Sequence, residues 1–147
     1  MIQPSRFEQG KAMLLAGSRQ YHLFSSVNQT IPQQWQYFKQ QYADLFNRSS
    51  RSFGATCMAD ANGFEYMCAV EVDSFEHLAA DTGRMIIKPQ HYAVFNHQGE
   101  IANIGKTWQQ IHQYIQKAHP CSHRISELFL IQIILSLLLF SVMLIVL

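Results

Sequence analysis

Six aromatic side chains spread along the sequence are the strongest candidates for a binding site. Flat aromatic rings offer a large apolar contact area, and their faces carry a partial negative charge that attracts cations. Such walls suit a lipophilic, cationic small molecule. The alternative is that these residues form the core, because aromatic residues at helical spacing usually pack inside. The six residues are Trp35, Phe38, Tyr66, Tyr92, Phe95 and Trp108.

A cationic ligand also needs an acidic side chain beside it, and the β-prone segment 64–72 contains two acidic residues. Glu65 and Glu71 share the polar face of this segment, because side chains alternate between the two faces of a strand. We keep Glu65 as the candidate ligand contact. A solvated carboxylate on the strand surface is the ordinary alternative.

The remaining titratable residues do not assemble into a catalytic or metal motif. His97 follows a predicted strand, where we expect it to fix the turn by hydrogen bonding rather than to act as a general base. His119, Cys121 and His123 form an H-x-C-x-H pattern, but structural zinc takes four ligands and no fourth is spaced nearby. No Gly-rich phosphate loop or G-x-S-x-G motif occurs. We therefore predict no catalytic residue, no metal and no cofactor.

The overall charge argues against a nucleic-acid ligand. The 147 residues carry eleven Lys and Arg against ten Asp and Glu, for a net charge of +1, and show no basic stripe to neutralise phosphates. The three cysteines contain no C-x-x-C pair and no secretory signal opens the chain, so we expect a cytoplasmic protein. Cys57 and Cys68 have no basic neighbour in their predicted strands and should be unreactive.

The elements that must position these residues occur in a repeated order. The first group contains strands near 10–22, 51–59 and 64–73, with a helix near 31–46 between the first and second strands. Thr30 and Gln33 fit a capping box at the start of this helix. Asn62-Gly63 marks the turn of a hairpin. The order then restarts with a strand near 85–97, divided at Pro89, and a helix near 101–117.

The repeat predicts two further strands after residue 118, but the segment 128–147 is an almost unbroken apolar run. As a helix it would be about 30 Å long, enough to cross a bilayer. Three interpretations stay open: a membrane anchor that keeps the globular part inside, an internal helix replacing the strands, or a frameshift-derived segment. We divide the chain into a domain over 1–120 and an apolar tail over 121–147, with membrane contact through 128–147.

Four segments together resemble a known family. They are IPQQWQYF (31–38), FEYMCAVEV (64–72), YAVFNHQG (92–99) and TWQQIHQYI (107–115), and they are similar to successive signatures of the GyrI-like domain. This bacterial domain is the effector-binding module of many AraC-type and MerR-type transcription regulators. The resemblance covers roughly residues 3–118, and it rests on the order and spacing of the four segments.

The resemblance implies an α+β fold, with one antiparallel sheet and two helices arranged as two pseudo-symmetric strand–helix–strand–strand units. A ligand groove for lipophilic, often cationic compounds, as in multidrug binding, is implied at the junction of the units. This chain departs from the pattern because no helix-turn-helix precedes residue 10. Its second unit is also expected to lack the last two strands, which carry the family's acidic ligand-binding residue, and to end in an apolar helix.

The favoured function is therefore the binding of a lipophilic, cationic small molecule by a free-standing effector-binding domain, for sensing or sequestration rather than catalysis. Two alternatives stay open. One is a hydrolase of small reactive electrophiles, as some free-standing members of the family are similar to hydrolases. The other is a protein-interaction module of the gyrase-inhibitor type, with DNA gyrase or a transcription regulator as its partner.

Overall fold

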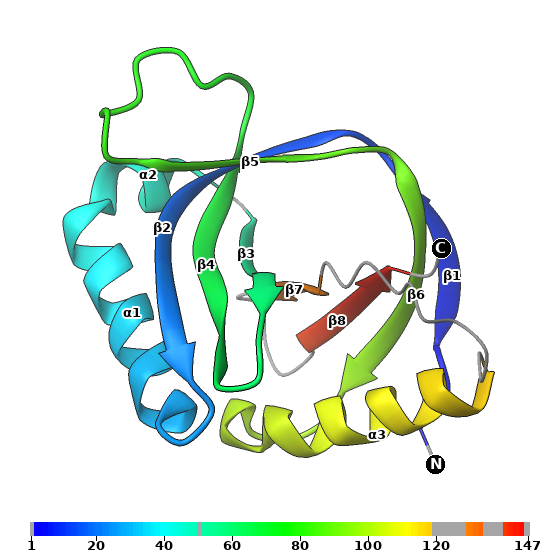
Figure 1. Cartoon of the computed structure of the whole chain (residues 1–147). Helices are drawn as coiled ribbons and strands as arrows, with labels where there is room; N and C mark the ends of the chain where they lie inside the picture. Colours follow the sequence, from blue (N-terminus) through cyan, green and yellow to red (C-terminus); the bar gives the residue numbers. More distant parts are fainter. Residues whose placement is uncertain (1, 50, 119–128, 134–139, 146–147) are drawn as a thin grey trace.

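A computed structural model describes residues 2–49, 51–118, 129–133 and 140–145 (Figure 1). Within them, eight strands form one sheet in the order β1-β6-β8-β7-β3-β4-β2-β5, and every pair is antiparallel. The strands are β1 (Arg6–Gly10), β2 (Met13–Leu23), β3 (Ser52–Ala59), β4 (Gly63–Val72), β5 (Gly83–Ile87), β6 (Gln90–His97), β7 (Phe129–Ile133) and β8 (Phe140–Ile145). The helices are α1 (Val27–Gln41), α2 (Ala43–Arg48) and α3 (Ile104–Ala118), with a 3-10 turn, η1 (Ile101–Asn103), before α3.

The sheet is built from two units with the same order of elements. The first unit is β2, α1, β3 and β4, the second unit is β6, α3, β7 and β8, and the two meet where β3 pairs with β7. The outer strands are exchanged between them. β1 precedes β2 in the chain but pairs with β6, whereas β5 precedes β6 but pairs with β2. The predicted α+β class and its internal repeat are confirmed.

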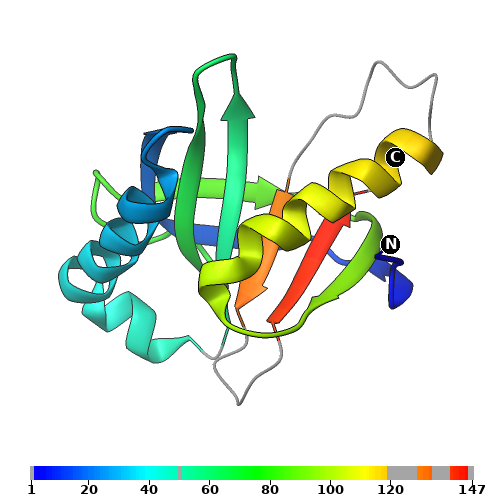
Figure 2. The same ribbon diagram turned by 90° about the horizontal axis from the view of Figure 1, so that it is seen from below.

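The sheet curves strongly, so that β2 and β4 stand opposite β6 and β1 (Figure 1). Each helix covers its own unit: α1 lies outside β2 and β4, and α3 packs on β6 (Figure 2). We call the side of the first unit turned away from α1 its inner face. The inner face carries a buried apolar cluster, formed by Leu15, Phe53, Ala55, Met67, Ala69 and Ile87.

The alternation predicted for β4 explains how this strand serves both sides of the sheet. Tyr66, Cys68 and Val70 pack with Phe38 beneath α1, while Met67 and Ala69 join the inner-face cluster. Glu65 lies two residues before Met67 and therefore also belongs to the inner face. Beneath α3, Ala93 and Phe95 of β6 pack against Ile111 and Ile115.

The predicted apolar helix at the C-terminus is wrong, and so is the predicted lack of the last two strands. Residues 129–133 form β7 and residues 140–145 form β8, which take the two places that the repeat requires. β7 lies between β3 and β8, and β8 lies between β7 and β6, so neither is an edge strand. A strand inside a sheet can be apolar on both faces, and its pattern is then hard to distinguish from that of a buried helix.

No helix in the described part of the chain is long and apolar enough to cross a membrane. The H-x-C-x-H segment over 119–123 lies outside the described residues.

The first helix also differs from its prediction at both ends. It begins at Val27, one turn early, so Thr30 lies inside the helix and forms no capping box with Gln33. The Thr30 hydroxyl lies 3.2 Å from the carbonyl oxygen of Ser26, four residues earlier, a contact that threonine makes at helical positions. The helix breaks at Tyr42 and continues as α2. The predicted division of the strand at Pro89 is confirmed, since Pro89 separates β5 from β6.

Candidate ligand site

Three of the predicted aromatic residues lie together, on the α1 side of the first unit. The Trp35 and Phe38 rings meet edge to face, with centroids 5.9 Å apart, and Trp35 Nε1 donates a hydrogen bond to Tyr66 Oη at 3.4 Å. The Tyr66 ring lies over Gly54, where a β-carbon would stand only 1.7 Å from Tyr66 Oη. Phe38 is fully buried and Tyr66 is 4% exposed, so a ligand would reach this cluster only if α1 moved.

The other three aromatic residues belong to the second unit and lie on two different sides of it. Phe95 is buried beneath α3, with its ring centroid 5.5 Å from that of Tyr114, and Trp108 is half-buried in the same cluster. Tyr92 lies on the opposite face of β6 and packs over Gly10 of β1. Gln90 Nε2 donates to Tyr92 Oη at 3.0 Å. The six aromatic side chains therefore do not form one wall.

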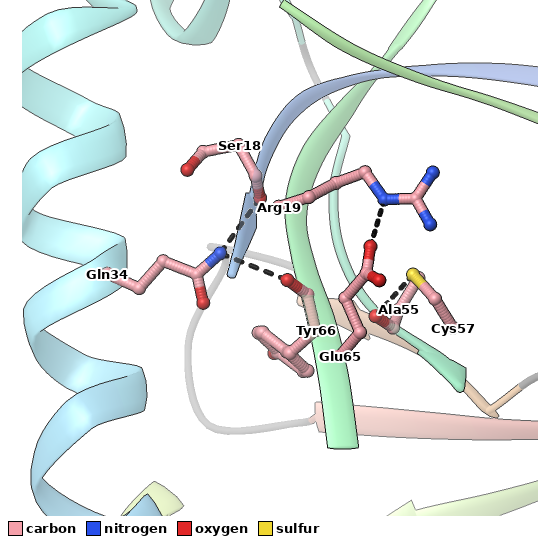
Figure 3. Close-up of polar contacts among 7 residues, drawn as sticks. All are labelled: Ser18, Arg19, Gln34, Ala55, Cys57, Glu65 and Tyr66. Atoms are coloured by element: carbon pink, nitrogen blue, oxygen red, sulfur yellow. Dashed lines mark hydrogen bonds and ion pairs between the residues drawn. The ribbon is translucent and has the colours of Figure 1, made fainter. Parts of the chain in front are cut away.

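Glu65 lies at the edge of the inner-face apolar cluster, beside two residues that sequence reasoning did not connect with it. Arg19 Nε of β2 donates to Glu65 Oε1, and Cys57 of β3 lies next to both side chains (Figure 3). The Arg19 and Glu65 side chains are 39% and 29% exposed, so the pair lies where the buried cluster meets solvent. We call Arg19, Cys57 and Glu65 the rim cluster.

The Cys57 thiol is partly shielded from water by the residues packed around it. Burial raises the pKa of the Cys57 thiol from 9.0 to about 11, although Arg19 opposes this shift. The sequence-based statement that Cys57 lacks a basic neighbour is therefore wrong, because Arg19 reaches it from the adjacent part of the sheet. The predicted lack of reactivity is nevertheless supported, because desolvation outweighs the guanidinium. Burial also raises the pKa of Cys68.

A buried polar network fixes α1 to the sheet behind the rim cluster. Gln34 Nε2 donates to the carbonyl oxygens of Ser18, at 2.8 Å, and Tyr66, at 3.1 Å (Figure 3). Gln34 Oε1 is left to accept from His22 Nε2 at 2.6 Å, and His22 Nδ1 meets the Thr30 hydroxyl at 2.7 Å. Sequence reasoning missed this network. The available signal was a glutamine on the apolar face of the helix, between Ile31 and Phe38.

His97 has the structural role that the sequence predicts. His97 Nε2 donates to the carbonyl oxygen of Glu100 at 3.0 Å, and His97 Nδ1 meets the Thr107 hydroxyl of α3 at 2.7 Å. These contacts fix the strand-to-helix turn. Within the described residues, no three His, Cys, Asp or Glu side chains are close enough to hold a metal ion.

A cavity of about 610 Å³ opens near the start of α3, and its character differs from that of the inner face. Amide and hydroxyl side chains dominate its lining, and Lys106 is the one side chain in it with a permanent charge. The lining residues are Ile2, Gln3, Ser5, Asn96, His97, Gln98, Asn103, Lys106, Thr107 and Gln110. A positive, polar cavity does not suit a lipophilic cation, so the rim cluster is the better candidate.

Several solved structures share this fold. SAV2435 bound to tetraphenylphosphonium has a TM-score of 0.76 and 18% identity, covering 95% of this chain and 92% of that chain. The Vibrio cholerae integron cassette protein VCH_CASS2 has a TM-score of 0.72 and 15% identity, covering 98% of this chain and 96% of that chain. A putative transcription regulation protein from Staphylococcus aureus MU50 has a TM-score of 0.73 and 18% identity, covering 95% of each chain.

Sequence comparison gives the family directly. No curated protein matches the chain. The family model of the integron-associated effector-binding protein Cass2, however, matches residues 6–125. This match spans most of the sequence, and the solved structures have the GyrI-like fold that the four motifs indicated. The chain therefore belongs to the Cass2 family of integron-associated effector-binding proteins.

Proposed function

We propose that this chain binds a lipophilic, cationic small molecule at the rim cluster, with Glu65 as the charge partner. The observation that carries the proposal is the position of this carboxylate at the edge of a buried apolar surface. A ligand there can place apolar groups against the partly buried side chains that border the inner-face cluster, such as Cys57, and its positive charge beside Glu65. Apolar burial contributes roughly 25 cal/mol per Å², so a large aromatic cation gains substantial affinity from its rings alone.

Two further observations support this ligand class. The chain belongs to a family of effector-binding proteins, and SAV2435, which shares its fold, has been solved with the lipophilic cation tetraphenylphosphonium. The net charge of +1 and the lack of a basic stripe do not favour a nucleic acid. Cys57 and Cys68 are free thiols, in keeping with the cytoplasmic location expected from the sequence.

The predicted aromatic residues have unequal places in this proposal. Tyr92 faces away from α3, and we propose it as a ligand contact from the second unit. Because it is only 1% exposed, its ring must move off Gly10 to meet a ligand. Trp35, Phe38 and Tyr66 lie directly behind Glu65, on the other face of β4. Because Trp35 Nε1 donates to Tyr66 Oη, a shift of β4 changes the environment of Trp35. Trp35 is therefore proposed as a reporter of binding. Phe95 and Trp108 support α3.

Isothermal titration calorimetry with tetraphenylphosphonium tests the proposal, with Trp fluorescence as a second readout. We expect Glu65→Gln to weaken binding about tenfold, which equals about 1.4 kcal/mol. Glu71→Gln is the matched control, because Glu71 lies on the same face of β4 and is also paired with an arginine, Arg51. If no lipophilic cation binds, the proposed function is wrong. If both variants weaken binding equally, the ligand is not at Glu65.

A further inference from the structure

The carboxylate assigned to the ligand already has a cation beside it. β2 and β4 pair so that Arg19 is opposite Met67 and Tyr21 is opposite Glu65. Arg19 and Glu65 are therefore diagonal neighbours on the inner face, within reach of a long side chain. Arg19 Nε donates to Glu65 Oε1, and Figure 3 shows the Nε edge of the guanidinium facing the carboxylate while its two terminal nitrogens point away from it.

The surroundings of Arg19 hold its stem but leave its charged end able to move. A β-carbon at Gly83 of β5 would lie 3.1 Å from Arg19 Cγ and 3.3 Å from Arg19 Cδ, so the stem passes closely over this glycine. The side chain is 39% exposed, and its polar contacts are with Glu65 and Cys57. The guanidinium can therefore turn into water without breaking any buried backbone contact.

We propose that Arg19 is an internal competitor of the ligand: it neutralises Glu65 in the free protein and must leave the carboxylate when a cationic ligand binds. The inference rests on the proposed function, because it places the Arg19 guanidinium of the free protein where the ligand's positive charge would bind. Arg19 then becomes the residue that determines which cations bind.

The exchange of one cation for another explains why such a site selects lipophilic cations. The loss of the Arg19 contact offsets part of the ligand's attraction to Glu65, so the net electrostatic gain is limited to about the tenfold that Glu65→Gln is expected to remove. A ligand gains affinity mainly from the apolar area that it buries at the border of the inner-face cluster, where side chains such as Cys57 are only partly buried. Small hydrated cations such as tetramethylammonium bury little area and cannot displace Arg19. Bulky aromatic cations can.

A double-mutant cycle measures the competition, with tetraphenylphosphonium as the probe and calorimetry as the readout. The four proteins are the wild type, Arg19→Met, Glu65→Gln and the double variant. We expect Arg19→Met to tighten binding about five- to tenfold when Glu65 is present. In the Glu65→Gln background the same substitution should tighten binding less than about twofold, because only screened long-range repulsion remains.

Arg51→Met is the matched control. Arg51 Nη1 contacts Glu71 Oε2 at 3.2 Å, and Glu71 is six residues from Glu65 on the same face of β4, a distance of about 20 Å. Arg51→Met lowers the net charge as much as Arg19→Met does, and we expect it to change affinity by less than about twofold. Arg19→Gln serves as a second variant if thermal melting shows that Arg19→Met is poorly folded. Tetramethylammonium should give no binding signal with the wild type.

The possible results separate the two proposals. If the wild type binds the probe but neither Arg19 variant binds more tightly, Arg19 only positions Glu65 and the proposal of competition is wrong. The competition is also wrong if the gain is equally large in the Glu65→Gln background, or if Arg51→Met gives the same gain. If none of the proteins binds the probe, the proposed function itself fails.

Discussion

The two units of the sheet share a framework but present different surfaces. Each buries a histidine near the end of its first strand, His22 or His97, at 1% exposure, and bonds Nδ1 to a helix threonine at 2.7 Å. The second ring nitrogen then differs. His22 Nε2 bonds to Gln34 inside the helix, whereas His97 Nε2 bonds to the Glu100 carbonyl in the turn.

This difference extends to the surfaces on which a ligand could bind. The first unit places Glu65 beside an apolar inner face, and the second unit places Lys106 in a polar cavity. The strand order and the histidine–threonine contact are repeated, but the charge and polarity of the exposed positions are not. We infer that the repeat supplies the scaffold, and that each unit's own surface side chains determine what it can bind.

The largest expected effect concerns whether the units can be separated. Deleting residues 119–147 removes β7 and β8, and with them the pairing of the first unit with the second through β3. A strand contributes several apolar side chains worth roughly 1.5–3 kcal/mol each, while a domain is stable by only about 5–15 kcal/mol. We expect the shortened chain to lose cooperative thermal unfolding, as followed by circular dichroism. A cooperative melt close to that of the full chain would mean that the first unit folds alone.

The next effect tests whether the two histidine contacts contribute unequally. Gln34→Ala removes the side-chain partner of the part-buried Ser18 carbonyl, the buried Tyr66 carbonyl and the His22 ring, so we expect a loss of about 2–4 kcal/mol. Thr107→Val removes one hydrogen bond to His97 and should cost about 1 kcal/mol. Urea unfolding measures both values, and the exposed neighbour variant Gln33→Ala is the control. Equal losses would contradict the comparison.

A pair of glycine substitutions should change stability in opposite directions in the two units. In Gly54→Ala the new methyl group would meet Tyr66 Oη, so Tyr66 must move and we expect a loss of about 1–3 kcal/mol. The Trp35 emission should shift too, because Trp35 donates to Tyr66. At Gly105 of α3 no atom lies within 4 Å of the added methyl group, so Gly105→Ala should stabilise the fold by about 0.5 kcal/mol. A stable Gly54→Ala variant with unchanged emission would show that Tyr66 is not held there.

Local sequence patterns predicted the hairpin of the first unit well because its strands have a period and a boundary signal, whereas the capping signal misplaced the start of α1. The alternation through β4 and the Asn62-Gly63 turn identified the hairpin, and Pro89 identified the break between β5 and β6. β7 and β8 carry no such period. Their apolar runs match both a helix and a strand that has neighbours on both edges, and only the pairing with β3 and β6 decides between them.

The candidate site was predictable in its residue types but not in its assembly. Alternation alone could assign Glu65 to the face of β4 opposite Tyr66. That face was expected to be polar, but it carries the buried Met67 and Ala69. The pairing of Glu65 with Arg19, 46 residues away in sequence, depends on the register between β2 and β4. The aromatic residues were grouped by chemistry, but the sheet separates them, because Tyr66 faces α1 while Tyr92 faces away from α3.

The smallest expected effect is the pH dependence of stability that the Cys57 thiol gives the first unit. The described strands of the second unit contain no cysteine and so have no equivalent. Cys57 has an ordinary pKa of 9.0, which burial raises to about 11 in the folded state. The folded chain therefore holds this proton more tightly than the unfolded chain. The resulting stabilisation is complete below pH 9 and is lost as the pH rises through 11.

We expect the melting temperature of the wild type to fall more steeply between pH 9 and 11 than that of Cys57→Ser. Lysine and tyrosine titrations affect both proteins and cancel in the difference. Cys68→Ser should flatten the curve over the same range, because burial also holds the folded pKa of Cys68 well above its ordinary value of 9.0. Parallel curves for the wild type and Cys57→Ser would contradict the assignment of Cys57 to a partly dehydrated rim.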